Sequence, residues 1–140
     1  STHKGLPGGI WGISGVTVSP VNSDIVWALI ENEKGGVYKS TDAGKTWSNI
    51  GLEKTLHISR IRIHPNNPDI VYVAAQGSAY GPTADRGIYK TTNGGENWER
   101  VLNIDEHTGV NEVHMDPRNS DVLYAVAFQR RRHVFTYCRD

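Results

Sequence analysis

Three carboxylates stand in segments of the chain that have no counterpart elsewhere in the sequence. Asp85 lies in the segment 77–86, and Asp105 and Glu106 lie in the segment 103–109. Glycoside hydrolysis needs two carboxyl groups placed across the scissile bond, so these three are candidate acid/base residues. His107, beside them, is a candidate ligand contact and proton shuttle. The structural alternative is that all four are ordinary solvated surface residues.

The same segments carry side chains suited to holding a ligand. Tyr80 has a ring that can stack on a sugar or on a peptide aromatic, although a loop tyrosine can equally be a packing anchor. An arginine can grip a carboxylate or phosphate with two parallel hydrogen bonds. The alternative for the arginine run is a solvated or salt-bridged edge. The candidate arginines are Arg86, Arg130, Arg131 and Arg132.

The composition of the chain argues against several classes of function. Fifteen basic and fifteen acidic residues give a net charge of zero, which leaves no electrostatic footprint for nucleic acid. No apolar run reaches the roughly 20 residues of a membrane span. His, Cys and carboxylate residues show no metal-ligand spacing, and Cys138 has no second cysteine to pair with. We therefore expect no metal, no cofactor and no membrane span.

The elements that must position these residues repeat along the chain. A phrase of strand, Pro/Asn/Asp turn and strand occurs three times, with Pro20, Pro65 and Pro117 at intervals of 45 and 52 residues. Such a period with short strands and fixed turn residues is typical of a β-propeller blade or a solenoid unit. We predict an all-β chain that forms about two and a half four-stranded antiparallel blades. The whole chain, 1–140, is then a partial propeller, with repeats at about 16–50, 58–102 and, incomplete, 111–140.

β-branched and aromatic runs bounded by Gly, Pro, Asn and Asp define the strands. The second strand of each repeat is apolar on both faces, which predicts that a neighbouring blade covers each face. The predicted strands are 16–19, 25–31, 36–41 and 47–50 in the first repeat, 58–64, 70–76, 87–92 and 98–102 in the second, and 111–115, 122–129 and 134–137 in the third.

A second phrase joins the third strand to the fourth. In it an Asp or Asn caps the turn, a Gly takes positive φ, and a Trp supplies a large apolar ring to the blade interface. We call residues 40–47 and 91–98 the first and second box turns. Because the phrase repeats, we interpret it as structural rather than as a binding site. Its residues are Ser40, Asp42, Gly44, Thr46 and Trp47, and then Thr91, Asn93, Gly95 and Trp98.

Up-and-down strands place connections alternately on two rims. The box turns and the Pro/Asn/Asp turns should share one rim, the box rim. The segments 52–57, 77–86 and 103–109 should share the opposite one, the loop rim. Variable loops on a repeated scaffold usually carry binding, so the loop rim is the predicted site.

The motif Ser40-x-Asp42-x-Gly44-x-Thr46-Trp47 resembles the Asp-box, or BNR repeat, of sialidase-like and sortilin-like propellers. Thr91-x-Asn93-x-Gly95-x-Asn97-Trp98 is a degenerate copy. The wider phrase resembles bacterial sortilin-type, glycosyl-hydrolase-like proteins, and xyloglucanase-type hydrolases carry related repeats. The resemblance implies the propeller fold and an extracellular or periplasmic location. It does not select an activity, since fold alone does not fix function.

Three functional hypotheses remain. The first is a non-catalytic propeller segment whose loop rim binds a protein, peptide or glycan. The second is part of a glycoside hydrolase, sialidase-like or xyloglucanase-like, that contributes one wall of the cleft. The third is a purely structural repeat. In each case the open ends of the blade stack predict a partner, either the remaining blades of a longer propeller or another copy of the chain.

Overall fold

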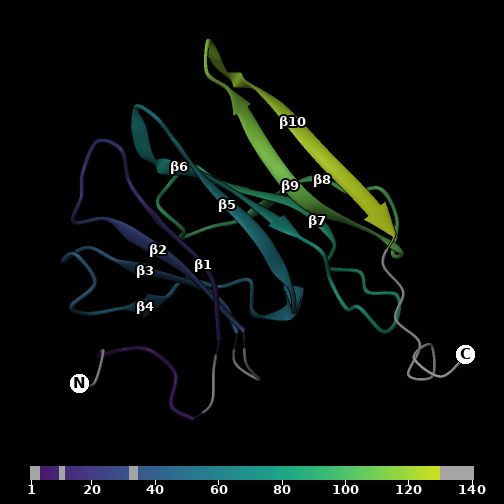
Figure 1. The fold of residues 1–140 in the computed structure, drawn as a ribbon, viewed down its shortest axis with the longest axis horizontal. Coiled ribbons are helices and arrows are strands. Elements are labelled where there is room, and N and C mark those ends of the chain that lie inside the picture. The colour runs from purple at the N-terminus through teal and green to yellow at the C-terminus, as the bar shows by residue number, and fades with distance from the viewer. Residues whose placement is uncertain (1–3, 10–11, 32–34, 130–140) are drawn as a thin grey trace, which may run out of the picture.

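The computed structural model describes residues 4–9, 12–31 and 35–129. They form three antiparallel sheets that lie side by side like the blades of a fan (Figure 1). Two sheets have four strands in chain order and the third has two. This confirms the predicted all-β fold and its two and a half blades. The predicted strand at 134–137 lies outside the described residues.

Each blade follows the chain without crossovers. Blade 1 contains β1 (Gly12–Val18), β2 (Val26–Glu31), β3 (Gly36–Ser40) and β4 (Ser48–Asn49). A short 3-10 turn, η1 (Glu53–Thr55), leads to blade 2, which contains β5 (Ile58–His64), β6 (Asn67–Ala75), β7 (Gly87–Thr91) and β8 (Glu99–Leu102). Blade 3 contains β9 (Thr108–Asp116) and β10 (Asn119–Gln129).

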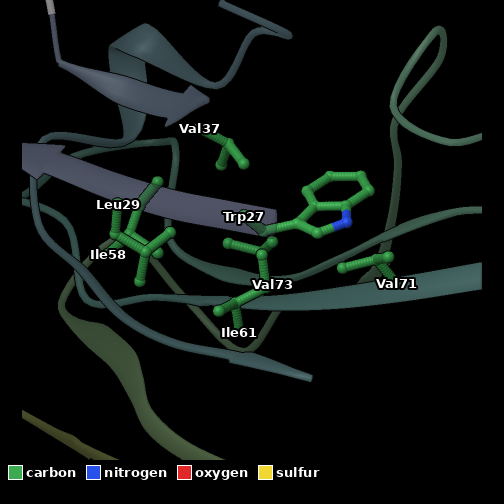
Figure 2. Close-up of a cluster of buried hydrophobic side chains, with 7 residues drawn as sticks. All are labelled: Trp27, Leu29, Val37, Ile58, Ile61, Val71 and Val73. Atoms are coloured by element: carbon green, nitrogen blue, oxygen red, sulfur yellow. The ribbon is translucent and has the colours of Figure 1, made fainter. Parts of the chain in front are cut away.

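The core consists of the interfaces between blades. We call the side of a blade that faces the next blade its leading face, and the opposite side its trailing face. Between blades 1 and 2 the leading-face residues Trp27, Leu29 and Val37 pack on trailing-face residues of β5 and β6, as Figure 2 shows. The trailing-face residues in this cluster are Ile58, Ile61, Val71 and Val73.

The second interface repeats the arrangement with smaller side chains. Tyr72, Ala74 and Ile88 on the leading face of blade 2 pack on Val110 and Val113 of β9. All five are buried. The period-2 alternation of β6 sends its successive residues into two different interfaces between blades. In β2 one face packs on blade 2, while Ala28 and Ile30 on the other face are buried under Leu6 and Trp47. Both second strands are therefore buried on two sides, but only β6 has a blade on each side.

The prediction fails on one side of β10. Leu123 and Ala127 pack against blade 2, but the large apolar side chains on the opposite face of β10 remain open to solvent. The physical reason is that no blade covers this face in the part of the chain that the structure describes. The exposed residues are Val122, Tyr124, Val126 and Phe128.

The two box turns share two backbone-to-side-chain hydrogen bonds, and the first adds one from the Thr46 hydroxyl. In the first, the amide of Gly44 donates to Ser40 Oγ at 2.8 Å, and the Thr46 amide and hydroxyl donate to the Asp42 carboxylate at 2.8 and 2.6 Å. In the second, Gly95 donates to Thr91 Oγ1 at 3.0 Å, and Asn97 donates to Asn93 Oδ1 at 3.0 Å.

Both box-turn glycines have positive φ, 86° for Gly44 and 98° for Gly95. A side chain is strained in this conformation, which explains a glycine at this place in both repeats.

The box turns lie on the predicted rim. The amide of Ala43 donates to the Asp24 carbonyl and that of Gly94 to the Asp69 carbonyl, each at 3.0 Å. Each box turn is therefore bonded to the Pro/Asn/Asp turn of its own blade. On the opposite rim, the amide of Thr83 donates to the Glu106 carbonyl at 3.0 Å, which joins segments 77–86 and 103–109.

The two box-turn tryptophans have different surroundings. Trp98 packs edge-on against Trp27 with ring centroids 6.3 Å apart, and its indole N–H donates to the Ile50 carbonyl of blade 1 at 2.7 Å. Trp47 donates to Gly44 within its own turn and packs against the outer cluster of Ala28, Ile30 and Tyr38. Trp98 therefore links two blades, whereas Trp47 closes one.

We expect Trp98→Ala to destabilise the chain by about 3–5 kcal/mol, because it removes a large ring from between two blades and leaves the Ile50 carbonyl without this donor. Trp47→Ala, the matched change in the first box turn, should cost less because both rings are half-buried but the Trp47 hydrogen bond stays within its own turn and joins no second blade. Urea unfolding followed by fluorescence gives both values. Equal losses would show that Trp98 has no special role between the blades.

The first box turn should also be acid-sensitive. Hydrogen bonds from Thr46, and then from Ser40, lower the pKa of Asp42 from 3.8 to about 2. The ionised carboxylate thus contributes stability in full above pH 3.8, and the contribution disappears as the pH falls through about 2. We expect Asp42→Asn to be less stable than the parent chain at pH 5 and to approach it at pH 2, measured by urea unfolding at both values.

Asn93 provides the control, because it holds the equivalent place without a charge. Asn93→Asp should add an acid-dependent contribution of the same sign. A gap between parent and Asp42→Asn that stays constant from pH 5 to pH 2 would contradict the assignment.

Candidate functional site

The loop rim is organised around the buried side chain of Arg86. The residue is 2% exposed. It donates to the carbonyls of Glu106 at 2.7 Å, Ser78 at 2.6 Å, Gly81 at 2.8 Å and also to that of Gln76. Burial lowers the pKa of Arg86, while the nearby negative charge of Asp105 raises it. The guanidinium still remains protonated, because arginine has a very high ordinary pKa. The loop therefore wraps around one cation.

These contacts give Arg86 a structural role in place of the predicted ligand-binding one. A guanidinium has five N–H donors, and four carbonyl oxygens surround this one. Three of those carbonyls belong to the loop or its edge and the fourth belongs to the link between blades 2 and 3. Arg86 thus fixes the position of the loop on the neighbouring link and is not presented to solvent.

The loop that Arg86 holds presents Tyr80 outward. Tyr80 is 70% exposed, and its backbone amide donates to Ser78 Oγ at 3.1 Å. The neighbouring Ala79 is buried and anchors the loop beside it. The ring therefore stands at the rim on a backbone that is held in place from below. An exposed ring of this kind does not act as a packing anchor.

Phe128 of blade 3 lies beside the base of the same loop. It lines a cavity of about 10 Å³ together with Gln76, Gly77, Ser78, Ala79 and Arg86. A space of that size holds no more than one water molecule. The cavity is a narrow gap between the loop and blade 3, too small for a ligand. A ligand bound at this rim would therefore lie on the surface.

Of the three predicted acid/base residues, Asp105 caps a turn. The Asp105 carboxylate accepts the amides of His107 at 2.8 Å and Thr108 at 2.6 Å. Hydrogen bonds from Thr108 and then His107 lower the pKa of Asp105. A lowered pKa keeps this carboxyl ionised, whereas a general acid needs a raised one.

The other predicted residues divide between two neighbourhoods. Glu106 lies 3.5 Å from His107 Nε2, so these two are brought together beside Asp105. The charge of Asp85 acts elsewhere: burial raises the pKa of Tyr89, Arg100 lowers it, and Asp85 raises it further. The predicted Arg130, Arg131 and Arg132 lie outside the described residues. Within the described chain no cluster of His, Cys, Asp and Glu could hold a metal ion, and no helix is long and apolar enough to cross a membrane.

A charged cluster that the sequence did not single out joins blades 2 and 3. Arg60 of β5 grips Glu112 of β9 with two hydrogen bonds of 2.5 and 2.6 Å. Arg62 and His114 lie 3.3 and 3.4 Å from the same carboxylate. The hydrogen bonds from Arg60 lower the pKa of Glu112. The sequence did carry one signal for this cluster. Arg60 and Arg62 are two residues apart on β5, and Glu112 and His114 are two apart on β9, so each pair lies on one face of its strand.

The comparisons with known proteins agree with this architecture. The family model described as Sortilin-Vps10 (sortilin, neurotensin receptor 3) matches residues 35–140. The chain belongs to this family. A xyloglucanase of Hypocrea jecorina is 25% identical over 126 residues, which are 79% of this chain and 14% of that protein. A probable oligoxyloglucan-reducing end-specific xyloglucanase of Neosartorya fischeri is 29% identical over 91 residues, 61% of this chain and 10% of that one.

Solved structures show the same fold. An ancestral GH74 enzyme superposes with a TM-score of 0.65 at 22% identity, over 81% of this chain and 16% of that one. The GH74 enzyme of Niastella koreensis superposes with a TM-score of 0.62 at 21% identity, over 83% and 19%. The chain thus spans less than a fifth of these relatives. The resemblance to sortilin-type and glycosyl-hydrolase-like repeat propellers is confirmed, and the chain is a β-propeller region similar to xyloglucanases.

Proposed function

We propose that this chain is a non-catalytic propeller segment whose loop rim binds a glycan through Tyr80. The observation that carries the proposal is the pairing of a buried Arg86 with an exposed Tyr80 in one loop. A loop that is held rigid loses little further conformational freedom when a ligand binds. An exposed aromatic ring on such a loop supplies apolar contact with a polar tip, which suits the face of a sugar ring.

The surroundings of Tyr80 favour a glycan over a strongly charged ligand. Arg86 is occupied by backbone carbonyls, and His107 lies beside two carboxylates. These acidic side chains and the exposed backbone can accept hydrogen bonds from sugar hydroxyls. Two relatives bear the name xyloglucanase, so xyloglucan oligosaccharides are the probe we choose. Binding to a protein or peptide ligand, and a purely structural role, are the alternatives that the experiment separates.

Tyr80→Ala should weaken binding of a xyloglucan oligosaccharide by about two- to tenfold, since an aromatic contact contributes about 0.5–1.5 kcal/mol. Tyr80→Phe should retain most of the affinity because the ring remains. Val21→Ala changes an exposed apolar residue on the box rim and should have no effect. Titration calorimetry or ligand-observed NMR measures all three. Absence of binding by the parent chain, or equal losses for Tyr80→Ala and Val21→Ala, would contradict the proposal.

The second candidate function, one wall of a hydrolase cleft, is favoured by the names of the relatives. It requires two carboxyl groups about 5–9.5 Å apart, one of them with a raised pKa. Asp105 has the opposite shift, and the charge of Asp85 acts on Tyr89.

We therefore expect the 140-residue chain to release no product from aryl β-glycosides or xyloglucan. Turnover that Asp105→Ala or Asp85→Ala abolishes would replace the binding proposal with the catalytic one. Reducing-end assays on the purified parent chain and both variants give the answer.

A further inference from the structure

A groove of about 240 Å³ separates the two box turns where blade 1 meets blade 2. Blade 1 forms one wall and the second box turn forms the other. Further blades would stack on the trailing face of blade 1 and on the leading face of blade 3, so they would leave this groove as it is. Its lining includes Lys39, Thr41, Ser48 and Ile50 of blade 1, and Asn93 and Glu96 of the second box turn.

Two hydrogen bonds hold the walls of the groove together. The Trp98 indole N–H donates to the Ile50 carbonyl at 2.7 Å, and Lys39 Nζ donates to the Gly94 carbonyl at 3.0 Å. A Cβ on Gly94 would lie 2.6 Å from Lys39 Nζ. An alanine there, like Ala43 at the equivalent place of the first box turn, would therefore displace the ammonium. The groove is preformed at this junction, so a ligand would order few further side chains on binding.

The groove holds one charge of each sign. Lys39 Nζ lies 5.2 Å from the centroid of the Trp27 ring, and this ring and the Gly94 carbonyl together fix the ammonium in place. An ammonium has three N–H donors, and Gly94 accepts one of them. Glu96, exposed on the wall from blade 2, brings a carboxylate. A strongly charged ligand would be repelled by one of these two groups, so the pair favours a neutral polar ligand.

Hydroxyl groups supply most of the remaining polar lining. Thr41 and Ser48 are exposed, and a hydroxyl both donates and accepts hydrogen bonds. Thr46 Oγ1 donates to Asp42 at 2.6 Å, so it meets a ligand as an acceptor. Sugar hydroxyls also donate and accept, and the half-buried Ile50 offers an apolar contact to the C–H groups of a ring. The volume is below the roughly 300–1,000 Å³ of pockets for larger ligands, which suits one sugar ring.

We propose that this groove, the box-rim groove, binds one neutral sugar unit, with Lys39 donating to its hydroxyls and Glu96 accepting from them. The site lies on the rim opposite Tyr80, so it is separate from the proposed loop-rim site and does not rest on it. The repeated motif does not generate the groove, because Glu96 stands where the first box turn has Lys45. The groove is a property of this junction and not of every box turn.

Nuclear magnetic resonance of the isotope-labelled chain tests the site. D-Glucose, D-galactose and D-xylose are titrated separately to tens of millimolar, because a single sugar ring with few contacts binds weakly. At least one of them should shift the amide signals of Thr41, Ser48 and Gly94. No shift with any of the three sugars would overturn the proposal. Inorganic phosphate should leave these signals in place, and a larger shift with phosphate than with every sugar would show an anion site and overturn it as well.

Two conservative variants test the named contacts. Glu96→Gln and Thr41→Val should each weaken sugar binding about two- to tenfold, since each alters one hydrogen bond to the ligand. Glu53→Gln is the matched control, because Glu53 is exposed in η1 on the loop rim, and it should keep the parent affinity. Urea unfolding verifies that each variant remains folded. Parent-like affinity in both Glu96→Gln and Thr41→Val would contradict the assignment.

The loop-rim variant Tyr80→Ala separates this site from the one proposed above. It should keep the parent affinity for the single sugars, because its ring lies on the other rim. A loss of that affinity in Tyr80→Ala would place the sugar on the loop rim and overturn the box-rim groove as its site.

Discussion

Every sheet in this chain has to be covered on both faces, and the rest of the structure depends on that constraint. Apolar residues at successive positions of β2 and β6 point to opposite faces of the sheet. If either face were open to water, a row of apolar side chains would be exposed. Stacking sheets solves the problem locally, because each interface reuses the same strand positions: Trp27 in one and Tyr72 in the next. The same constraint leaves Val16 and Tyr124 open at the two ends.

The loops of the loop rim can differ in length and sequence because the repeated turns that join the strands within each blade lie on the box rim. Asp24 and Asp69 bind the box turns of their own blades through backbone hydrogen bonds, so these hairpins need nothing from the opposite rim. A loop there lacks an apolar core of its own, and Arg86 provides the alternative. One buried cation that donates hydrogen bonds to four carbonyls satisfies backbone groups which would otherwise need water. Tyr80 can then stand in solvent on an ordered backbone.

Repetition explains which features could be predicted from the sequence. The strands, the shared rim of the box turns and the positive φ of Gly44 and Gly95 all occur twice or more, so each copy supports the interpretation of the other. The contacts of Arg60 with Glu112 and of Arg86 with its carbonyls occur once and leave no periodic trace. Arg86 also shows why residue type alone misleads: a loop arginine can bind a ligand or bind the loop itself, and only the positions of the surrounding carbonyls distinguish the two.

Equivalent residues in the two repeats do not necessarily make equivalent contacts. Trp47 and Trp98 end the same motif, yet one donates its indole N–H to Gly44 in its own turn and the other to Ile50 of the preceding blade. The difference follows from position in the stack, since blade 2 has a preceding blade to bond with, while the N-terminal segment carrying Leu6 packs at the corresponding place on blade 1. The sequence of a repeat therefore specifies a turn, and its neighbours determine whether the Trp at the end of that turn closes one blade or joins two.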